Sequence, residues 1–141
     1  MCIRDSCTRN QQAITNAIKR LQSININVSL FIDPAEPQIR AALALGARMI
    51  ELNTARYSDA TLTNRATKEG ADALEGLKQA AEFAHGNKLQ VLAGHGLTYR
   101  NVIAVARIPQ IVELNIGHNI IARAAMVGLE RAVRDMLDLL S

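Results

Sequence analysis

Hydrophobic positions along the chain follow two alternating periodicities. Apolar residues recur at helical spacing in segments that predict helices at about residues 11–21, 36–45, 68–84, 98–108, 119–126 and 129–140. Between them, short runs rich in branched residues predict strands at residues 27–33, 48–53, 88–92 and 111–116. Residues 54–67 are read as a polar loop. Strands that alternate with helices indicate right-handed βαβ crossovers and therefore a parallel sheet.

Four strand–helix units fit two α/β architectures, an open doubly wound sheet or half of a (β/α)8 TIM barrel. A complete barrel typically needs about 250 residues, whereas this chain has 141. In both architectures ligands bind at the C-terminal ends of the strands. The turns at these ends are polar or glycine-rich: Asp33-Pro34, Asn53-Thr54, Gly94-His95-Gly96 and Gly117-His118.

Composition narrows the class of protein. Apolar residues make up 49% of the chain and charged residues 21%, as in ordinary globular domains, and no apolar run approaches the roughly 18 residues of a membrane span. The net charge of +3 is mild and the basic residues are scattered. Neither nucleic acid nor a membrane is therefore an expected partner, and the cytoplasm is the expected compartment. Cys2 and Cys7 have no partner at metal spacing, which argues against a zinc site or a disulfide framework.

His95 is the first candidate for chemistry, because it lies between Gly94 and Gly96 directly after a predicted strand. Glycines allow backbone to approach a ligand closely and expose N–H groups to an anion, and histidine exchanges protons near neutral pH. Gly117 and His118 repeat this arrangement after the next strand. The helix that follows them offers its N-terminal N–H groups and dipole to a phosphate. A turn histidine and a helix-capping histidine remain alternative interpretations.

Charged residues supply further candidates. Glu51 lies inside an otherwise apolar strand, where an inward carboxylate is costly unless it is paired or used, and Glu113 has a similar place. An outward-facing glutamate is the alternative in both cases. Three arginines are possible phosphate partners, although solvated surface positions are the more usual outcome: Arg56, Arg100 and Arg123.

Several of these segments together resemble the pyridoxine 5′-phosphate synthase family. The resemblance rests on segments that occur in the family's order and spacing: residues 28–33 (VSLFID), 93–99 (AGHGLTY), 113–118 (ELNIGH) and 120–124 (IIARA). It runs from about Gln11 to the end of the chain. It implies a (β/α)8 barrel in which residues 10–141 supply strands five to eight, the C-terminal half. Residues 1–9 lack any periodicity and are interpreted as a non-native leader.

The resemblance also implies an activity. The family condenses 1-deoxy-D-xylulose 5-phosphate with 3-amino-2-oxopropyl phosphate to give pyridoxine 5′-phosphate, phosphate and water in vitamin B6 biosynthesis. It is a transferase-class enzyme that uses no metal or organic cofactor and forms homo-oligomers. By resemblance His95 is the proton donor and Glu51 assists the chemistry, while Gly96, Gly117 and His118 bind the phosphate of the aminoketone.

The chain departs from the family pattern at three places near this site. Members commonly show Glu-x-His-Thr-Gly in the sixth strand, where this chain has Asn53 and Ala55, and an asparagine where it has Leu92. The bases that the family carries on its early strands have no match here. We therefore expect the 141-residue chain alone to be inactive and to self-associate through its exposed sheet edges.

Two other classes of function compete with a synthase fragment. One is a non-catalytic half-barrel that binds phosphate or assembles with itself or a partner. The other is a different phosphate-handling barrel enzyme, such as an aldolase that forms a Schiff base. That chemistry needs a buried lysine at a strand end, and the placement of Lys88 and of the other lysines argues against it.

Overall fold

The computed structural model describes residues 10–62 and 67–140. Its helices are α2 (Gln11–Gln22), α3 (Glu36–Ala44), α4 (Ala55–Ala60), α5 (Lys68–Gly86), α6 (Val102–Ala106), α7 (His118–Val127) and α8 (Leu129–Leu137). Its strands are β1 (Ser29–Ile32), β2 (Met49–Asn53), β3 (Gln90–Gly94) and β4 (Ile111–Asn115). The leader predicted at residues 1–9 lies outside the described residues.

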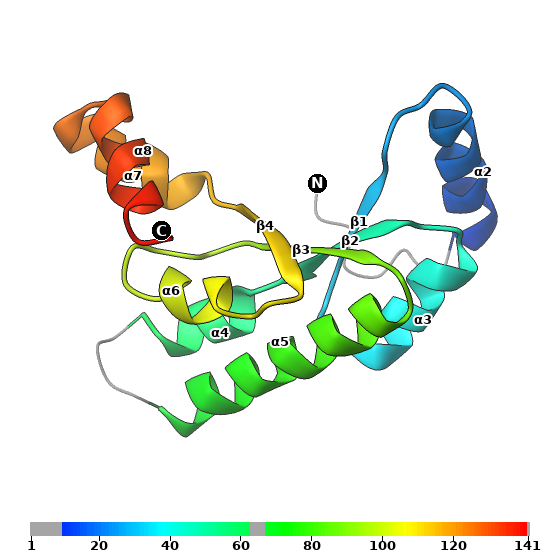
Figure 1. The fold of residues 1–141 in the computed structure, drawn as a ribbon, viewed down its shortest axis with the longest axis horizontal. Coiled ribbons are helices and arrows are strands. Elements are labelled where there is room, and N and C mark those ends of the chain that lie inside the picture. Colours follow the sequence, from blue (N-terminus) through cyan, green and yellow to red (C-terminus); the bar gives the residue numbers. More distant parts are fainter. Residues whose placement is uncertain (1–9, 63–66, 141) are drawn as a thin grey trace.

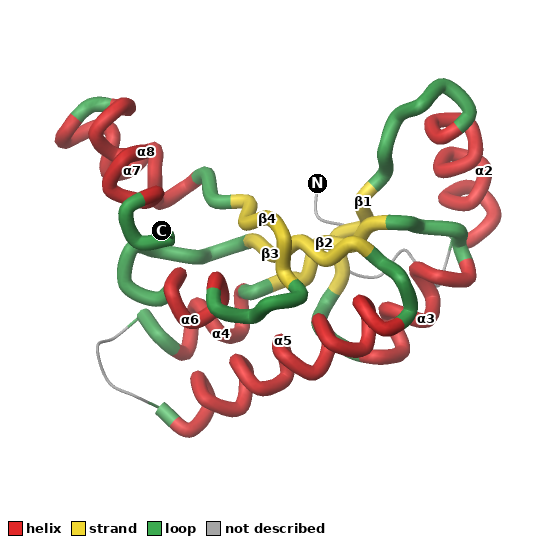
Figure 2. The backbone as a smooth tube through the Cα atoms, viewed as in Figure 1, coloured by secondary structure: helices red, strands yellow, loops and turns green. Residues whose placement is uncertain are grey.

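The four strands form one parallel sheet in the order β1-β2-β3-β4. Each strand pairs with the next one in the sequence, as expected when every crossover has the same hand. Figures 1 and 2 show the strands in the middle of the molecule, with α3, α4, α5 and α6 along one side. The pair α7 and α8 lies beyond one end of the sheet and α2 beyond the other. The predicted α/β fold with consecutive βα units is confirmed.

The hydrophobic core lies between the sheet and these helices. Ile50 and Leu52 of β2 are fully buried there, together with Leu77 and Ala81 of α5. Because side chains alternate between the faces of a strand, Glu51 points to the opposite face of the sheet. Among the described elements, α3, α4, α5 and α6 therefore lie on the other face of the sheet from this carboxylate.

Both edges of the sheet are open in the described part of the chain. Strands β1 and β4 each pair with a single neighbour, so each presents a row of backbone N–H and C=O groups to solvent. On β4, Val112 is 62% exposed. Closed parallel barrels have no such edges, and four consecutive units make half of an eight-stranded barrel.

Some element boundaries differ from the sequence-based predictions. The segment read as a polar loop contains the short helix α4, whose first N–H, that of Ala55, donates to the Asn53 side chain at 3.0 Å. Helix α6 begins at Val102 rather than near Thr98, because Asn101 accepts hydrogen bonds from the Thr98 N–H and hydroxyl and closes a turn first. Strand β3 continues to Gly94, two residues beyond its predicted end.

Candidate functional site

A pocket of about 510 Å³ opens at the C-terminal ends of the strands. It is lined by Phe31, Glu51, His95, Gly96, Leu97, Asn115, Ile116, Gly117 and His118. The parallel register explains why these distant residues meet, since Phe31 lies opposite Glu51 and Gly94 opposite Asn115 in neighbouring strands. The structure thus brings together all five site residues that the sequence analysis named.

His95 begins the loop after β3 in a left-handed backbone conformation, with φ of 83°, and Gly96 follows with φ of 79°. For a residue other than glycine this conformation costs roughly 1–2 kcal/mol, so the surroundings must hold it. The imidazole is exposed in the pocket, and its ring centroid lies 6.1 Å from that of Phe31. The histidine is therefore accessible to a ligand.

Gly94 is required by close packing at the same strand end. A Cβ there would lie 2.9 Å from the Asn115 carbonyl oxygen and 3.0 Å from the Asn115 Cβ, and it would also meet the Glu51 carboxylate. Gly96 is required twice over, by its positive φ and because a Cβ on it would lie 2.9 Å from Ser58 Cβ. The glycines on either side of His95 thus meet steric demands of β4 and α4.

The Glu51 carboxylate lies on the face of the sheet opposite α3, α4, α5 and α6, and it accepts a hydrogen bond of 3.0 Å from Asn115 Nδ2. Partial burial raises the pKa of Glu51 above its ordinary value, and the nearby Glu113 charge adds to this. The bond from Asn115 and the proximity of His95 lower the pKa but do not cancel the rise. A carboxyl group poised in this way can exchange a proton closer to neutral pH than an ordinary glutamate.

Gly117 and His118 lie where β4 leads into α7. Gly117 is the N-cap of this helix, and the first turn contains no acidic residue. The first N–H groups of a helix have no intrahelical acceptor, and the helix dipole adds positive potential there. A Cβ on Gly117 would meet nothing within 4 Å. This end of α7 therefore offers open space and hydrogen-bond donors suited to a phosphate group.

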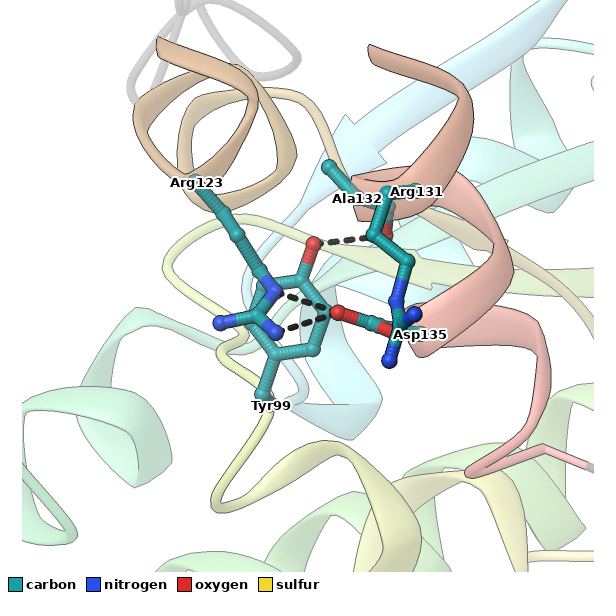
Figure 3. Close-up of polar contacts among 5 residues, drawn as sticks. All are labelled: Tyr99, Arg123, Arg131, Ala132 and Asp135. Carbon is teal, nitrogen blue, oxygen red and sulfur yellow. Dashed lines mark hydrogen bonds and ion pairs between the residues drawn. The ribbon is translucent and has the colours of Figure 1, made fainter. Parts of the chain in front are cut away.

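A cluster of polar contacts fixes α7 and α8 against the loop that follows β3. The Arg123 guanidinium lies 5.2 Å from the Tyr99 ring centroid and forms an ion pair with Asp135, which also accepts a 2.7 Å bond from Arg131. The Tyr99 hydroxyl donates to the Ala132 carbonyl at 2.8 Å (Figure 3). The hydrogen bonds from Arg123 and Arg131 lower the pKa of Asp135.

These contacts correct one interpretation of the sequence. Arg123 was a possible phosphate partner, but its side chain is engaged by Asp135 and Tyr99. It borders a second pocket, of about 660 Å³, which also contains Asp135 and Asp138. Arg100 lines this second pocket as well, so two arginines and two carboxylates face it.

Three residues that shape the site were not among the candidates predicted from the sequence. Asn115 holds the Glu51 carboxylate, and Thr54 and Ser58 contact the backbone of His95. Asn115 was detectable in principle as a polar residue at a strand end. Thr54 is likewise a polar residue directly after a strand, whereas Ser58 lies in helix α4, which no periodicity indicated.

Comparison with known proteins places the chain in a family. The model of the family described as "Pyridoxal phosphate biosynthesis protein PdxJ" matches residues 6–141. The chain belongs to the PdxJ family. Curated relatives named pyridoxine 5′-phosphate synthase include that of Idiomarina loihiensis, 50% identical over 129 residues, and that of Crocosphaera subtropica, 51% identical over 125 residues. These alignments cover 92% and 89% of this chain but 52% and 50% of the relatives.

The chain thus spans about half the length of the PdxJ relatives that it matches. A solved structure, that of the YdjI aldolase from Escherichia coli K12, is similar to this chain with a TM-score of 0.55 and 14% sequence identity. The alignment covers 96% of this chain and 53% of the aldolase chain. That likeness concerns the fold alone, and it supports half of an aldolase-type TIM barrel. The predicted fold class is confirmed.

The departures from the PdxJ pattern have a structural setting. Asn53 is buried, donates to Asp33 at 2.9 Å and accepts from the Ala55 N–H, so it joins β1 to the start of α4. Leu92 is buried on β3 beside Glu51 in the sheet register. Within the described residues, no three His, Cys, Asp or Glu side chains cluster as a metal site would require. No helix in this part of the chain is long and apolar enough to cross a membrane.

Proposed function

We propose that this chain is the C-terminal half of a pyridoxine 5′-phosphate synthase. In this proposal the complete enzyme condenses 1-deoxy-D-xylulose 5-phosphate with 3-amino-2-oxopropyl phosphate to give pyridoxine 5′-phosphate, phosphate and water. One observation carries the proposal: a PdxJ-family chain gathers His95, Glu51, Gly96, Gly117 and His118 around one pocket at the strand ends. The enzyme works in the cytoplasm, as a homo-oligomer, without a metal or organic cofactor.

The N-terminal end of α7 supplies the proposed phosphate-binding site. The phosphate of the aminoketone binds at Gly117 and His118, where helix N–H groups and open space meet, and reaches Gly96 across the pocket. Glycine at two of these three positions allows the phosphate oxygens to approach the backbone. Binding there holds the carbon skeleton of the substrate over the strand ends.

His95 and Glu51 are the groups that transfer protons in this proposal. The reaction expels water, and a departing hydroxyl group must receive a proton. His95, exposed in the pocket, donates it. Glu51, with its raised pKa and its bond from Asn115, assists by exchanging a proton in the same pocket. A positioned acid or base of this kind contributes about 10²–10⁴-fold to the rate.

The test restores the missing half of the barrel. The chain is co-expressed with the N-terminal half of the Idiomarina loihiensis synthase, and pyridoxine 5′-phosphate formation is followed by chromatography. We expect turnover from the complex, no turnover from the 141-residue chain alone, and a loss of about 10²–10⁴-fold in the His95→Ala complex. His85→Ala is the matched control, because His85 lies in the last turn of α5, outside the pocket. Unchanged turnover in His95→Ala would remove this residue from the mechanism.

The open sheet edges favour a second candidate, a self-assembling half-barrel that binds phosphate without catalysis. The same experiment separates the two. A co-purified complex that binds inorganic phosphate but forms no product would support the non-catalytic assembly and contradict the synthase.

A further inference from the structure

The conformation of His95 depends on something other than its own residue type. Its φ of 83° is uncommon for any residue other than glycine, although histidine adopts it more often than most, and Gly96 continues the left-handed path. A strained backbone at a site persists only where neighbouring groups determine it. The contacts of the His95 carbonyl identify those neighbours.

Thr54 makes the closest of these contacts. It follows β2 directly and is fully buried. Its Oγ1 lies 2.6 Å from the His95 carbonyl oxygen and 2.8 Å from that of Gly94, so one hydroxyl proton serves both. The Thr54 N–H also donates to the Gly94 carbonyl at 2.8 Å. Ser58 Oγ approaches the same His95 oxygen, but only to 3.4 Å.

These bonds decide which way the loop faces. The His95 carbonyl points toward the buried threonine beneath the loop, while the His95 side chain is exposed in the pocket. Rotation of the peptide between residues 95 and 96 would break the Thr54 bond and redirect the Gly96 N–H. Rotation of the preceding peptide, between residues 94 and 95, would break the bond from Thr54 to the Gly94 carbonyl and change φ of His95. Both peptides that flank the imidazole are therefore tied to one hydroxyl group.

We propose that Thr54 is a positioning residue for His95, whose carbonyl its hydroxyl holds on the buried side of the loop. The importance of this for catalysis rests on the proposed function, but the conformational statement rests on the contacts alone. Thr54 touches the backbone of the loop and does not line the pocket, so it acts through His95.

The test uses the 141-residue chain and NMR of ¹³C,¹⁵N-labelled histidine, of which the chain has three. Thr54→Val removes the hydroxyl at nearly constant shape, and Thr54→Ser keeps it. The Cα and Cβ shifts of His95 report its φ and ψ, and its HN–Hα coupling reports φ. Loss of one hydrogen bond changes a conformational population about five-fold. We expect Thr54→Val to move the His95 signals away from left-handed values, Thr54→Ser to restore them, and those of His85 and His118 to stay in place.

Three outcomes overturn the proposal. The first is a folded Thr54→Val chain with unchanged His95 signals. The second is a Ser58→Ala chain, with Thr54 intact, that shifts His95, because Ser58 would then be the anchor. The third applies if Thr54→Val does not fold: a wild-type Thr54 hydroxyl proton that exchanges rapidly with water instead of slowly. None of these depends on turnover, so a failure of His95→Ala to affect the completed enzyme would contradict the proposed function and leave this result standing.

Discussion

Replacement of Gly94 by alanine tests the packing on which the site is built. Gly94 pairs with Asn115 in the sheet register, and an added Cβ would lie 2.9 Å from the Asn115 carbonyl oxygen. The Glu51 side chain can swing away from the new methyl group, but the Asn115 backbone is held in β4. The strands must therefore separate locally, and overpacking of this kind costs about 1–3 kcal/mol.

Urea unfolding measures this cost. With a slope of about 1–3 kcal/mol/M, a loss of about 2 kcal/mol lowers the midpoint by roughly 1 M. The matched control is Gly76→Ala in α5, where a Cβ would meet nothing within 4 Å. Alanine in a helix interior is better than glycine by about 0.5–1 kcal/mol, so the control midpoint rises. The two substitutions add the same methyl group and are expected to have opposite signs.

The pair also has a clear refuting result. If Gly94→Ala unfolds at the wild-type midpoint with the same slope, β3 and β4 do not approach closely at the strand ends. Contact with Asn115 would then not be the reason that glycine precedes His95. A fall in both variants would instead show that the methyl group acts through something other than contact with Asn115.

Three further predictions concern charge, the α7–α8 contacts and the open edge. The raised pKa of Glu51 means that the folded chain binds this proton more tightly than the unfolded one, so stability falls as pH rises from about 4.5 through the folded pKa. Glu51→Gln should flatten that fall in urea midpoints measured across the same range. Tyr99→Phe removes the bond to Ala132 and should cost about 0.5–1.5 kcal/mol of unfolding free energy. Val112→Lys on edge strand β4 should reduce self-association, seen as a smaller concentration-dependent mass in light scattering; an unchanged mass would place the association elsewhere.

The order of elements followed from the sequence because its cause is local. Buried parallel strands need branched apolar runs, and helices that pack on one side need apolar residues at helical spacing. These patterns extend over enough residues to predict two of the elements, β2 with Ile50 and Leu52 and α5 with Leu77. The strand-end turns could be predicted for the same reason, and they placed His95 and Gly117 together at the C-terminal ends of the strands.

Helix α4 was not legible because six residues are too few to establish a period. Its stability is non-local: the Tyr57 hydroxyl donates to the Asn101 carbonyl at 2.9 Å, forty-four positions along the chain. The role of Arg123 is also set by a distant residue, because its ion-pair partner Asp135 belongs to the next helix. A polar side chain in a sequence does not reveal whether a distant residue already engages it.

The contacts between β2, β3 and the residues that follow them show how such distant interactions shape the site. The register places Asn53, the last residue of β2, opposite Gly94, the last residue of β3. The next residues along the two strands, Thr54 and His95, are therefore also neighbours, and the Thr54 hydroxyl donates to the His95 carbonyl. Parallel strands of matched length thus set one loop against the next. A ligand that contacts residues from several strand ends then meets loops whose positions are mutually fixed, which reduces the entropy lost on binding. Between the departures at Asn53 and Ala55 the chain keeps Thr54, whose hydroxyl and N–H both donate to the Gly94 carbonyl of β3.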